Sequence, residues 1–212
     1  MKPRIYVDFD DVLCETAQEF LRVLDREFGR KVAFDEIYSF DLAKSFGLDS
    51  ASVARLMQRV HQPDVLAAMQ PAPGAVEALR HWADAGCEIW VVTGRPAYTR
   101  SSSEAWLHRH RVPYDVLDFV DKYGRVDPRE DRTDLLNLSE LTKIDFCIAV
   151  EDSPDMVKFL TAHTRALVVM LARPWNEKMD LGSSARFTRC KNWQEILRKF
   201  PSPNLMDRPS ET

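Results

Sequence analysis

The sequence lacks the patterns that define several common protein classes. Cysteine is scarce: Cys14, Cys87, Cys147 and Cys190 lie far apart, with no Cys-x-x-Cys pair. This spacing argues against a zinc site, an iron-sulfur cluster or a disulfide framework. The chain also contains no Gly-x-Ser-x-Gly, no Gly-x-x-x-x-Gly-Lys and no Gly-x-Gly-x-x-Gly. The hydrolase elbow, the phosphate loop and the dinucleotide fingerprint are therefore absent.

Long apolar runs and an excess of positive charge are missing as well. The first apolar run breaks at Asp8, far short of a signal-peptide core or a membrane span, so we expect a cytoplasmic protein. The formal net charge is -4 and the pI is near 5.8. These values predict neither a nucleic acid polymer nor a membrane as partner, and nothing in them sets an oligomeric state. A small anionic substrate would have to be held locally, through a metal.

What is present is the composition of a globular α/β protein. The 212 residues are 45% hydrophobic and 29% charged, which is typical of one globular domain or of one domain with an insertion. Short apolar runs alternate with longer amphipathic stretches, which predicts a Rossmann-like parallel sheet with helices on both faces. The expected strands are Arg4–Phe9, Glu88–Val92, Val116–Val120, Ile144–Val150 and Ala166–Met170.

A helical segment interrupts this alternation after the first strand. A helix is expected at Thr16–Phe28, ended by Gly29, and no strand follows before Pro71. The core resumes with a helix at Ala75–Ala85, for which Gly86 is the expected C-cap. We therefore predict an α/β core at 1–15 and 72–200, a small helical cap at 16–71 and a flexible tail at 201–212. A charged loop is expected at 124–134 and a helix at 135–141.

Polar residues follow four of the expected strands. Ligands bind at the carboxyl ends of parallel strands, so these residues should share one edge of the sheet. Crowded carboxylates need a cation to relieve their repulsion, and Mg²⁺ prefers hard oxygen ligands together with substrate phosphate. The residues are Asp8 and Asp10 after the first strand, Thr93 and Gly94 after the second, Lys122 after the third, and Glu151 and Asp152 after the fourth.

These four elements, in this order, resemble the motifs of the haloacid dehalogenase-like phosphatases, over roughly residues 4–170. The resemblance implies that Asp8 attacks phosphorus to give an aspartyl-phosphate, while Asp10 acts as general acid and base. It also implies that Thr93, Gly94 and Lys122 hold the phosphoryl oxygens. The implied Mg²⁺ ligands are Asp8, the main-chain carbonyl of Asp10 and Asp152, with Glu151 acting through a water.

Two lysines compete for the third motif. Lys143 lies at the start of the strand that ends at Val150, and about seven residues at ~3.3 Å each separate it from the catalytic edge. Lys122 lies just beyond a carboxyl end and is preferred. Taken singly, Asp11 and Asp155 are interpreted as helix caps or solvated residues. The five histidines, including His108 and His110, lack metal-ligand spacing.

A closer resemblance is to the 5'(3')-deoxyribonucleotidase branch. It is carried by Pro71-x-Pro73-Gly74-Ala75 and by Arg173-Pro174-Trp175-Asn176, although Gly94 and Glu151 depart from that branch. It implies a nucleoside monophosphate as the small phosphorylated substrate. The candidate substrate-selecting residues are Tyr38, Phe40, Phe46, Arg95 and Trp175, although aromatic residues such as the three in the cap more often form the core of a small helical unit than a platform for a base. The alternatives are a sugar-phosphate phosphatase or phosphomutase, or a non-catalytic metal-binding module.

Overall fold

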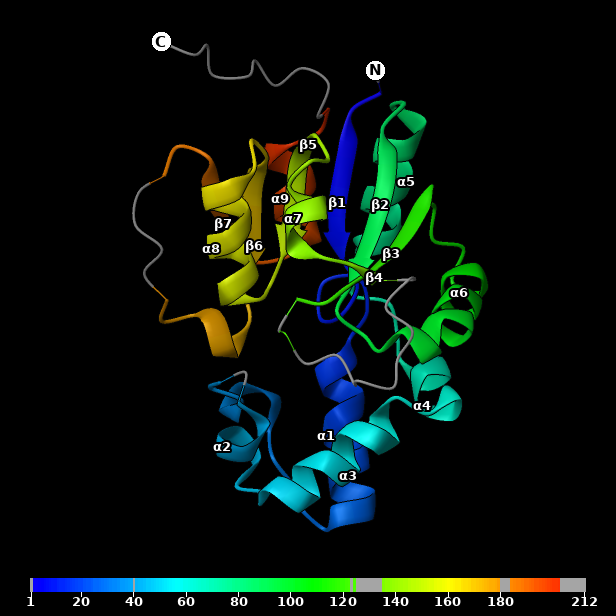
Figure 1. Ribbon diagram of the computed structural model, residues 1–212, viewed down its shortest axis with the longest axis vertical. Helices are drawn as coiled ribbons and strands as arrows, with labels where there is room; N and C mark the ends of the chain where they lie inside the picture. The colour runs from blue at the N-terminus through cyan, green and yellow to red at the C-terminus, as the bar shows by residue number, and fades with distance from the viewer. Residues whose placement is uncertain (1, 40, 123, 125–134, 180–183, 203–212) are drawn as a thin grey trace.

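A single parallel sheet organises the molecule. The computed structural model describes residues 2–39, 41–122, 124, 135–179 and 184–202. The sheet has seven strands in the order β4-β3-β2-β1-β5-β6-β7, and each neighbouring pair is parallel (Figure 1). The strands are β1 (Arg4–Asp8), β2 (Glu88–Thr93), β3 (Val116–Val120), β4 (Leu135–Leu136), β5 (Phe146–Glu151), β6 (Leu167–Leu171) and β7 (Phe187–Cys190).

Helices cover both faces of the sheet, because a parallel strand can be reached only by a crossover connection. One face packs against α5 (Ala75–Asp84), α6 (Arg100–Arg109) and α9 (Trp193–Lys199), whose buried residues include Trp82, Trp106 and Trp193. The other face packs against α7 (Leu138–Leu141) and α8 (Pro154–His163). The central strand β1 is buried on both sides, so the acidic turn that follows it lies between two packed layers.

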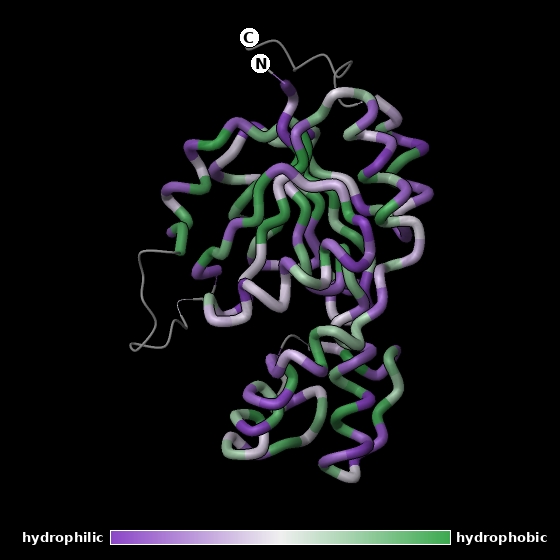
Figure 2. The backbone as a smooth tube through the Cα atoms, turned by 90° about the vertical axis from the view of Figure 1, so that its right-hand side faces the viewer, coloured by the Kyte–Doolittle hydropathy of each residue, from purple (hydrophilic) through white to green (hydrophobic). Residues whose placement is uncertain are grey.

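The segment between β1 and β2 forms a helical lobe beside the carboxyl edge of the sheet (Figures 1 and 2). Its elements are α1 (Thr16–Phe28), η1 (Phe34–Glu36), α2 (Leu42–Phe46), α3 (Ser50–Val60) and α4 (Pro63–Ala68). The chain enters and leaves this lobe side by side. The amide of Glu15 donates to the Gln70 carbonyl at 2.8 Å, and that of Ala72 donates to the Leu13 carbonyl at 2.9 Å. These two crossings form the junction between the lobe and the core.

The predicted α/β class and the five predicted strands are confirmed; β3 has the predicted ends, and the ends of the other four differ by at most two residues. The helix predicted at 135–141 is wrong in its first part, because Leu135–Leu136 pair with β3 and the helix begins at Leu138. Sequence reasoning missed β7, whose four residues have no long apolar run. Gly29 ends α1 at φ 63° as predicted, whereas Ala85 is the C-cap of α5 and Gly86 follows it.

Two predicted segments fall largely outside the described residues. Of the charged loop at 124–134 the structure describes only Gly124, and of the predicted tail it describes only residues 201–202. Within the described part of the chain, no helix has the length and apolar character needed to cross a membrane.

Candidate active site

The turn after β1 presents carboxylates in succession at the edge of the sheet. The carbonyl of Phe9 accepts hydrogen bonds from the amides of Leu13 and Cys14 at 3.1 and 3.0 Å, which closes the turn. Asp11 adopts a left-handed conformation, φ 55°, that is uncommon for residues other than glycine. Its carboxylate accepts a 2.9 Å hydrogen bond from the amide of Ala17 in the first turn of α1, whose N-cap position is Glu15. Asp8, by contrast, is 5% exposed and lies inside the site.

Lys122 joins Asp8 to the end of β5. Its ammonium donates a short hydrogen bond to Asp8 Oδ1 and a second one, at 2.7 Å, to Glu151 Oε1. Glu151 also accepts hydrogen bonds from the Tyr6 hydroxyl at 2.9 Å and from the amides of Asp152 and Ser153 at 3.0 and 2.9 Å. Four protein donors therefore surround the fully buried Glu151 carboxylate, which compensates for its lost hydration.

Three buried acidic residues form a cluster that could hold a cation. One carboxylate oxygen from each of Asp8, Glu151 and Asp152 lies within 4.8 Å of the others. Burial, followed by the negative charge of neighbouring carboxylates, raises the pKa of Asp8 and that of Asp152 well above the usual range. Asp8 and Asp152 each keep one oxygen that accepts no hydrogen bond from the described residues. The cluster thus offers hard carboxylate oxygens, two of them without a hydrogen bond from the described residues, and such ligands fit Mg²⁺.

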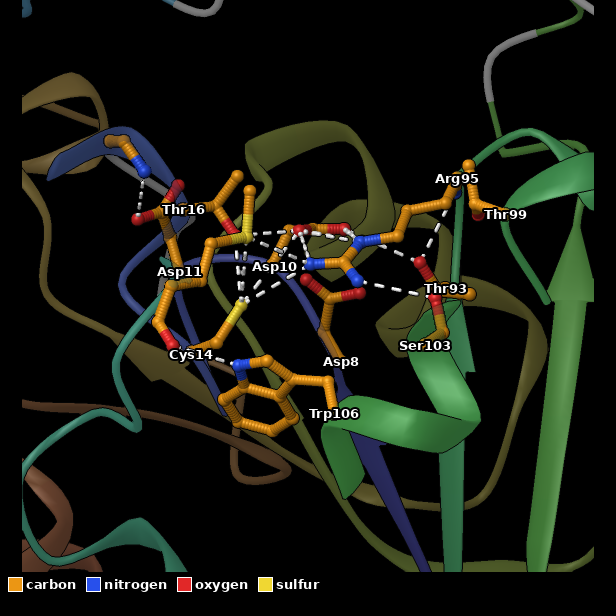
Figure 3. A network of polar contacts seen from close by, with 12 residues as sticks. Asp8, Asp10, Asp11, Cys14, Thr16, Thr93, Arg95, Thr99, Ser103 and Trp106 are labelled. Carbon is orange, nitrogen blue, oxygen red and sulfur yellow. Dashed lines mark hydrogen bonds and ion pairs between the residues drawn. The ribbon is translucent and has the colours of Figure 1, made fainter. Parts of the chain in front are cut away.

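Asp10 has a different environment from Asp8, although only one residue separates them. The guanidinium of Arg95 donates to both Asp10 oxygens, from Nε at 3.0 and 3.1 Å and from Nη2 at 2.7 Å (Figure 3). The Thr16 hydroxyl donates to Oδ1 at 2.6 Å, and the Thr93 hydroxyl donates to Oδ2 at 3.3 Å. Burial alone would raise the pKa of Asp10, but the charge and hydrogen bonds of Arg95, with help from Thr16, lower it overall.

The structure brings together the predicted residues of the sheet edge. Thr93 is fully buried beside Asp10, Gly94 follows it at the surface, and Lys122 and the pair at 151–152 surround Asp8. Trp175 donates its indole N–H to Asp152 Oδ2 at 2.9 Å, so it lies beside the acidic cluster.

The predicted substrate-selecting residues have dissimilar positions. Tyr38 is 63% exposed, and Phe46 is 2% exposed within the apolar core, which leaves its ring no face for a ligand. Phe40 lies outside the described residues. Arg95 is 4% exposed and is committed to Asp10. Phe46 and Arg95 are thus buried against protein partners, and their contact with a substrate stays a prediction.

Sequence reasoning missed two residues that support the site: the Thr16 hydroxyl donates to Asp10, and the Tyr6 hydroxyl donates to Glu151. Arg173, named above as part of a sequence string, donates from Nε to the Asp11 carbonyl at 2.8 Å. Thr16 was visible only as the first residue of a helix, and Tyr6 only as a strand residue. Their roles depend on which side chain faces which, and a strand or helix pattern does not specify that.

A Rossmann-like sheet, acidic residues after β1 and β5, a threonine after β2 and a lysine after β3 together define a haloacid dehalogenase-like hydrolase. Within that class, the chain belongs to the family described as 5' nucleotidase, deoxy (pyrimidine), cytosolic type C, whose model matches residues 2–200. The family model thus spans the core, the helical lobe and the site.

Comparison with individual proteins agrees with this class. A protein of Halalkalibacterium halodurans named as a candidate nucleotidase is 23% identical over 193 residues, which are 91% of this chain and 89% of that protein. The human membrane-associated phosphatidylinositol transfer protein 2 is 36% identical over 94 residues, but these are 44% of this chain and 6% of that protein.

Solved structures share the fold. A predicted phosphatase from Clostridium acetobutylicum superposes with a TM-score of 0.64 at 13% identity, covering 94% of this chain and 98% of that one. CbbY from Rhodobacter sphaeroides, solved in complex with phosphate, gives 0.56 at 17% identity, covering 92% and 96%. At these identities the likeness is one of fold.

Proposed function

We propose that this protein is a Mg²⁺-dependent phosphomonoester hydrolase that works through an aspartyl-phosphate, with deoxyribonucleoside monophosphates as substrates. One observation carries the proposal. Asp8, Lys122 and Asp152 come from three different strand ends and meet at one buried point, beside Asp10. A structural role would not require so much like charge in one place, since each buried carboxylate costs desolvation energy.

The reaction divides into two proton-coupled steps. An oxygen of Asp8 attacks the phosphorus in line with the leaving oxygen; the bond from phosphorus to that oxygen breaks as Asp10 gives it a proton. A water then attacks the phosphorus of the aspartyl-phosphate while Asp10 takes up its proton, which releases phosphate and restores the Asp8 carboxylate. Arg95 lowers the pKa of Asp10 in the absence of substrate, and the negative phosphoryl group would act in the opposite direction.

The remaining residues would stabilise charge. Lys122, Thr93 and the Gly94 amide would donate hydrogen bonds to the phosphoryl oxygens, and removal of one such donor typically costs about 10²- to 10³-fold in kcat. Mg²⁺ would be held by Asp8, Asp152 and the main-chain carbonyl of Asp10, and when bound it would neutralise phosphoryl charge. Glu151, whose oxygens face four protein donors, would support Lys122 and the start of α8.

The nucleotide preference is supported by the family's description and by the candidate nucleotidase relative. The helical lobe would act as a cap over the leaving group. One contact supports this arrangement: the rings of Phe34, in the lobe, and Trp175, beside Asp152, lie 5.8 Å apart at 72°. Trp175 and Tyr38 stay predicted contacts for a planar base. A cytoplasmic location also stays a prediction, in keeping with the family's description as cytosolic.

A substrate panel with matched variants tests this function. Purified protein with Mg²⁺ is expected to release phosphate from deoxyribonucleoside 5'- or 3'-monophosphates faster than from sugar phosphates, and Asp8→Asn is expected to abolish release. Asp155→Asn, an equal change of charge at an exposed residue of α8, serves as control. The reverse preference would favour the sugar-phosphate alternative. Absence of activity towards every monoester, aryl phosphates included, would favour a non-catalytic metal-binding module.

A further inference from the structure

Arg95 is a buried cation whose side chain is held from several directions. Its side chain is 2% exposed, and its guanidinium carbon lies 3.9 Å from the centroid of the Phe9 ring. Nη1 donates to the Ser103 hydroxyl on α6 at 3.2 Å, as Figure 3 shows. A stacked and anchored guanidinium has little freedom to move, so the groups that it touches are positioned by it.

The polar edge of this guanidinium faces Asp10. Nε and Nη2 donate to the carboxylate at 2.7–3.1 Å, which fixes the plane of the carboxylate. Oδ1 accepts the two shortest hydrogen bonds, from Nη2 and from the Thr16 hydroxyl. Oδ2 accepts longer ones, from Nε at 3.1 Å and from Thr93 at 3.3 Å. Oδ1 is thus the anchored oxygen, and Oδ2, on the Thr93 side, is the one available to exchange a proton.

The same guanidinium also touches the junction between the core and the helical lobe. Nη2 lies 3.3 Å from Cys14 Sγ and 3.3 Å from Met69 Sδ. Cys14 is on the segment that enters the lobe, and Met69, the C-cap of α4, is on the segment that leaves it. Arg95 therefore contacts Asp10 and both segments that connect the core to the lobe. Each of its guanidinium nitrogens already has a protein partner in the absence of substrate.

We propose that Arg95 is a positioning residue that acts through Asp10, holding Oδ1 so that Oδ2 faces the oxygen of the leaving group. The proposal rests on the proposed function, because the proton transfer by Asp10 belongs to it. It assigns Arg95 a part in the chemical step in place of substrate selection. Thr16 completes the anchor from the opposite side, at the first residue of α1.

The leaving group provides the test, because a general acid matters for a poorly departing alkoxide and little for an acidic phenol. Values of kcat/KM, which report on steps up to the first phosphoryl transfer, are measured for a nucleoside 5'-monophosphate and for 2,4-dinitrophenyl phosphate. Arg95→Met is expected to lower the first by about 10²- to 10³-fold, within the range for general-acid catalysis, and the second by less than about 10-fold. Asp10→Asn should show the same selectivity, and Arg95→Lys should lie between wild type and Arg95→Met.

Two further variants keep the test decisive. Thr16→Val removes the other anchor of Oδ1 without leaving a buried cation unpaired, and a selective loss of about 3- to 10-fold towards the nucleotide is expected, near one hydrogen bond. Arg26→Met changes an exposed arginine of α1 and should alter neither substrate's rate. If Arg95→Met does not fold, as judged by circular dichroism, Arg95→Lys and Thr16→Val decide the outcome.

Two results would overturn the inference. An equal loss for both substrates would mean that Arg95 acts on the phosphoryl group or on the fold. A rise in KM for the nucleotide with unchanged kcat would mean that it selects the substrate. If wild type hydrolyses neither compound in the presence of Mg²⁺, the proposed function itself has failed and this inference falls with it; wild-type activity combined with an unselective loss rejects the inference alone.

Discussion

Asp8 and Lys122, which are 114 residues apart in the sequence, form a buried ion pair at the carboxyl edge of the sheet. β1 and β3 are not neighbours, since β2 lies between them. Lys122 lies two residues beyond the end of β3, and its side chain reaches Asp8 at the end of β1, where Glu151 accepts the second hydrogen bond of the ammonium. One lysine thereby offsets part of the charge of two carboxylates, and removing it would leave both unpaired.

Lys122→Met is accordingly expected to remove activity and to destabilise the metal-free protein by about 3–5 kcal/mol, the usual cost of leaving a buried charge without its partner. Added Mg²⁺ should recover part of that stability, because a cation restores the missing positive charge. Thermal unfolding with and without Mg²⁺ measures both effects. Lys143→Met, at an exposed lysine before β5, is the control and should change neither. Equal stability of the two variants without metal would contradict the prediction.

Mg²⁺ itself is expected to stabilise the wild-type protein. Asp8 and Asp152 repel each other in a buried site, and their raised pKa values show that the ionised pair is unfavourable. Binding to the folded state alone stabilises by about 2.7 kcal/mol at a hundredfold excess over Kd. The Tm should therefore rise with Mg²⁺ and fall on chelation, and Asp152→Asn should shift the midpoint of that titration to higher Mg²⁺. A Tm that is insensitive to Mg²⁺ would argue against the metal site.

The variant Glu151→Gln tests whether Glu151 acts by holding Lys122 or by binding the metal. The amide nitrogen of glutamine cannot accept a hydrogen bond, so either Lys122 with Tyr6 or the two amides at the start of α8 lose their acceptor. A hydrogen bond to a charged group contributes about 1.5–3 kcal/mol, so Glu151→Gln is expected to lower kcat by roughly 10- to 100-fold. The Mg²⁺ midpoint should stay near that of wild type. A shift as large as that of Asp152→Asn would make Glu151 a direct ligand.

Asp118 lies on β3, away from the site, and its burial leads us to expect that the free energy of unfolding depends on pH. Its Oδ2 is buried without a hydrogen-bond partner among the described residues, and burial raises the pKa of Asp118 against the opposing charge of Arg100. The unfolded value is about 3.9, so the folded state binds this proton more tightly. The free energy of unfolding should thus decrease as pH rises from below the unfolded pKa through the folded one.

Asp118→Asn removes this titration. The variant should be more stable than wild type at pH 7, by about 1 kcal/mol, the order expected for a buried unsatisfied polar group. The advantage should vanish below about pH 4, where wild-type Asp118 is protonated in both states. Urea unfolding at several pH values measures it, and a difference that is independent of pH would show that charge is not the cause.

The sequence alone determined the class of fold and which polar residues lie at the carboxyl edge of the sheet. Apolar runs such as the one ending at Asp8 are long enough to be strands, and parallel strands place the residues after them at one edge. Asp10, Thr93, Lys122 and Asp152 could therefore be found from position alone, and Lys143 could be set aside by its distance along a strand. β4 and β7 could not be found in this way, because strands of two and four residues are too short to show a hydrophobic pattern. They are defined by their pairing with β3 and β6.

The tertiary structure decided the partners of each charged group. Arg95 was predicted to touch substrate, yet α6 and Phe9 bring its guanidinium against Asp10. Glu151 was expected to reach a metal through water, which stays a prediction, and the sequence did not indicate the four donors from three segments of the chain that surround it. A sequence pattern specifies which residues share an edge, because periodicity is local. Which oxygen faces which donor depends on packing between residues that are about a hundred positions apart.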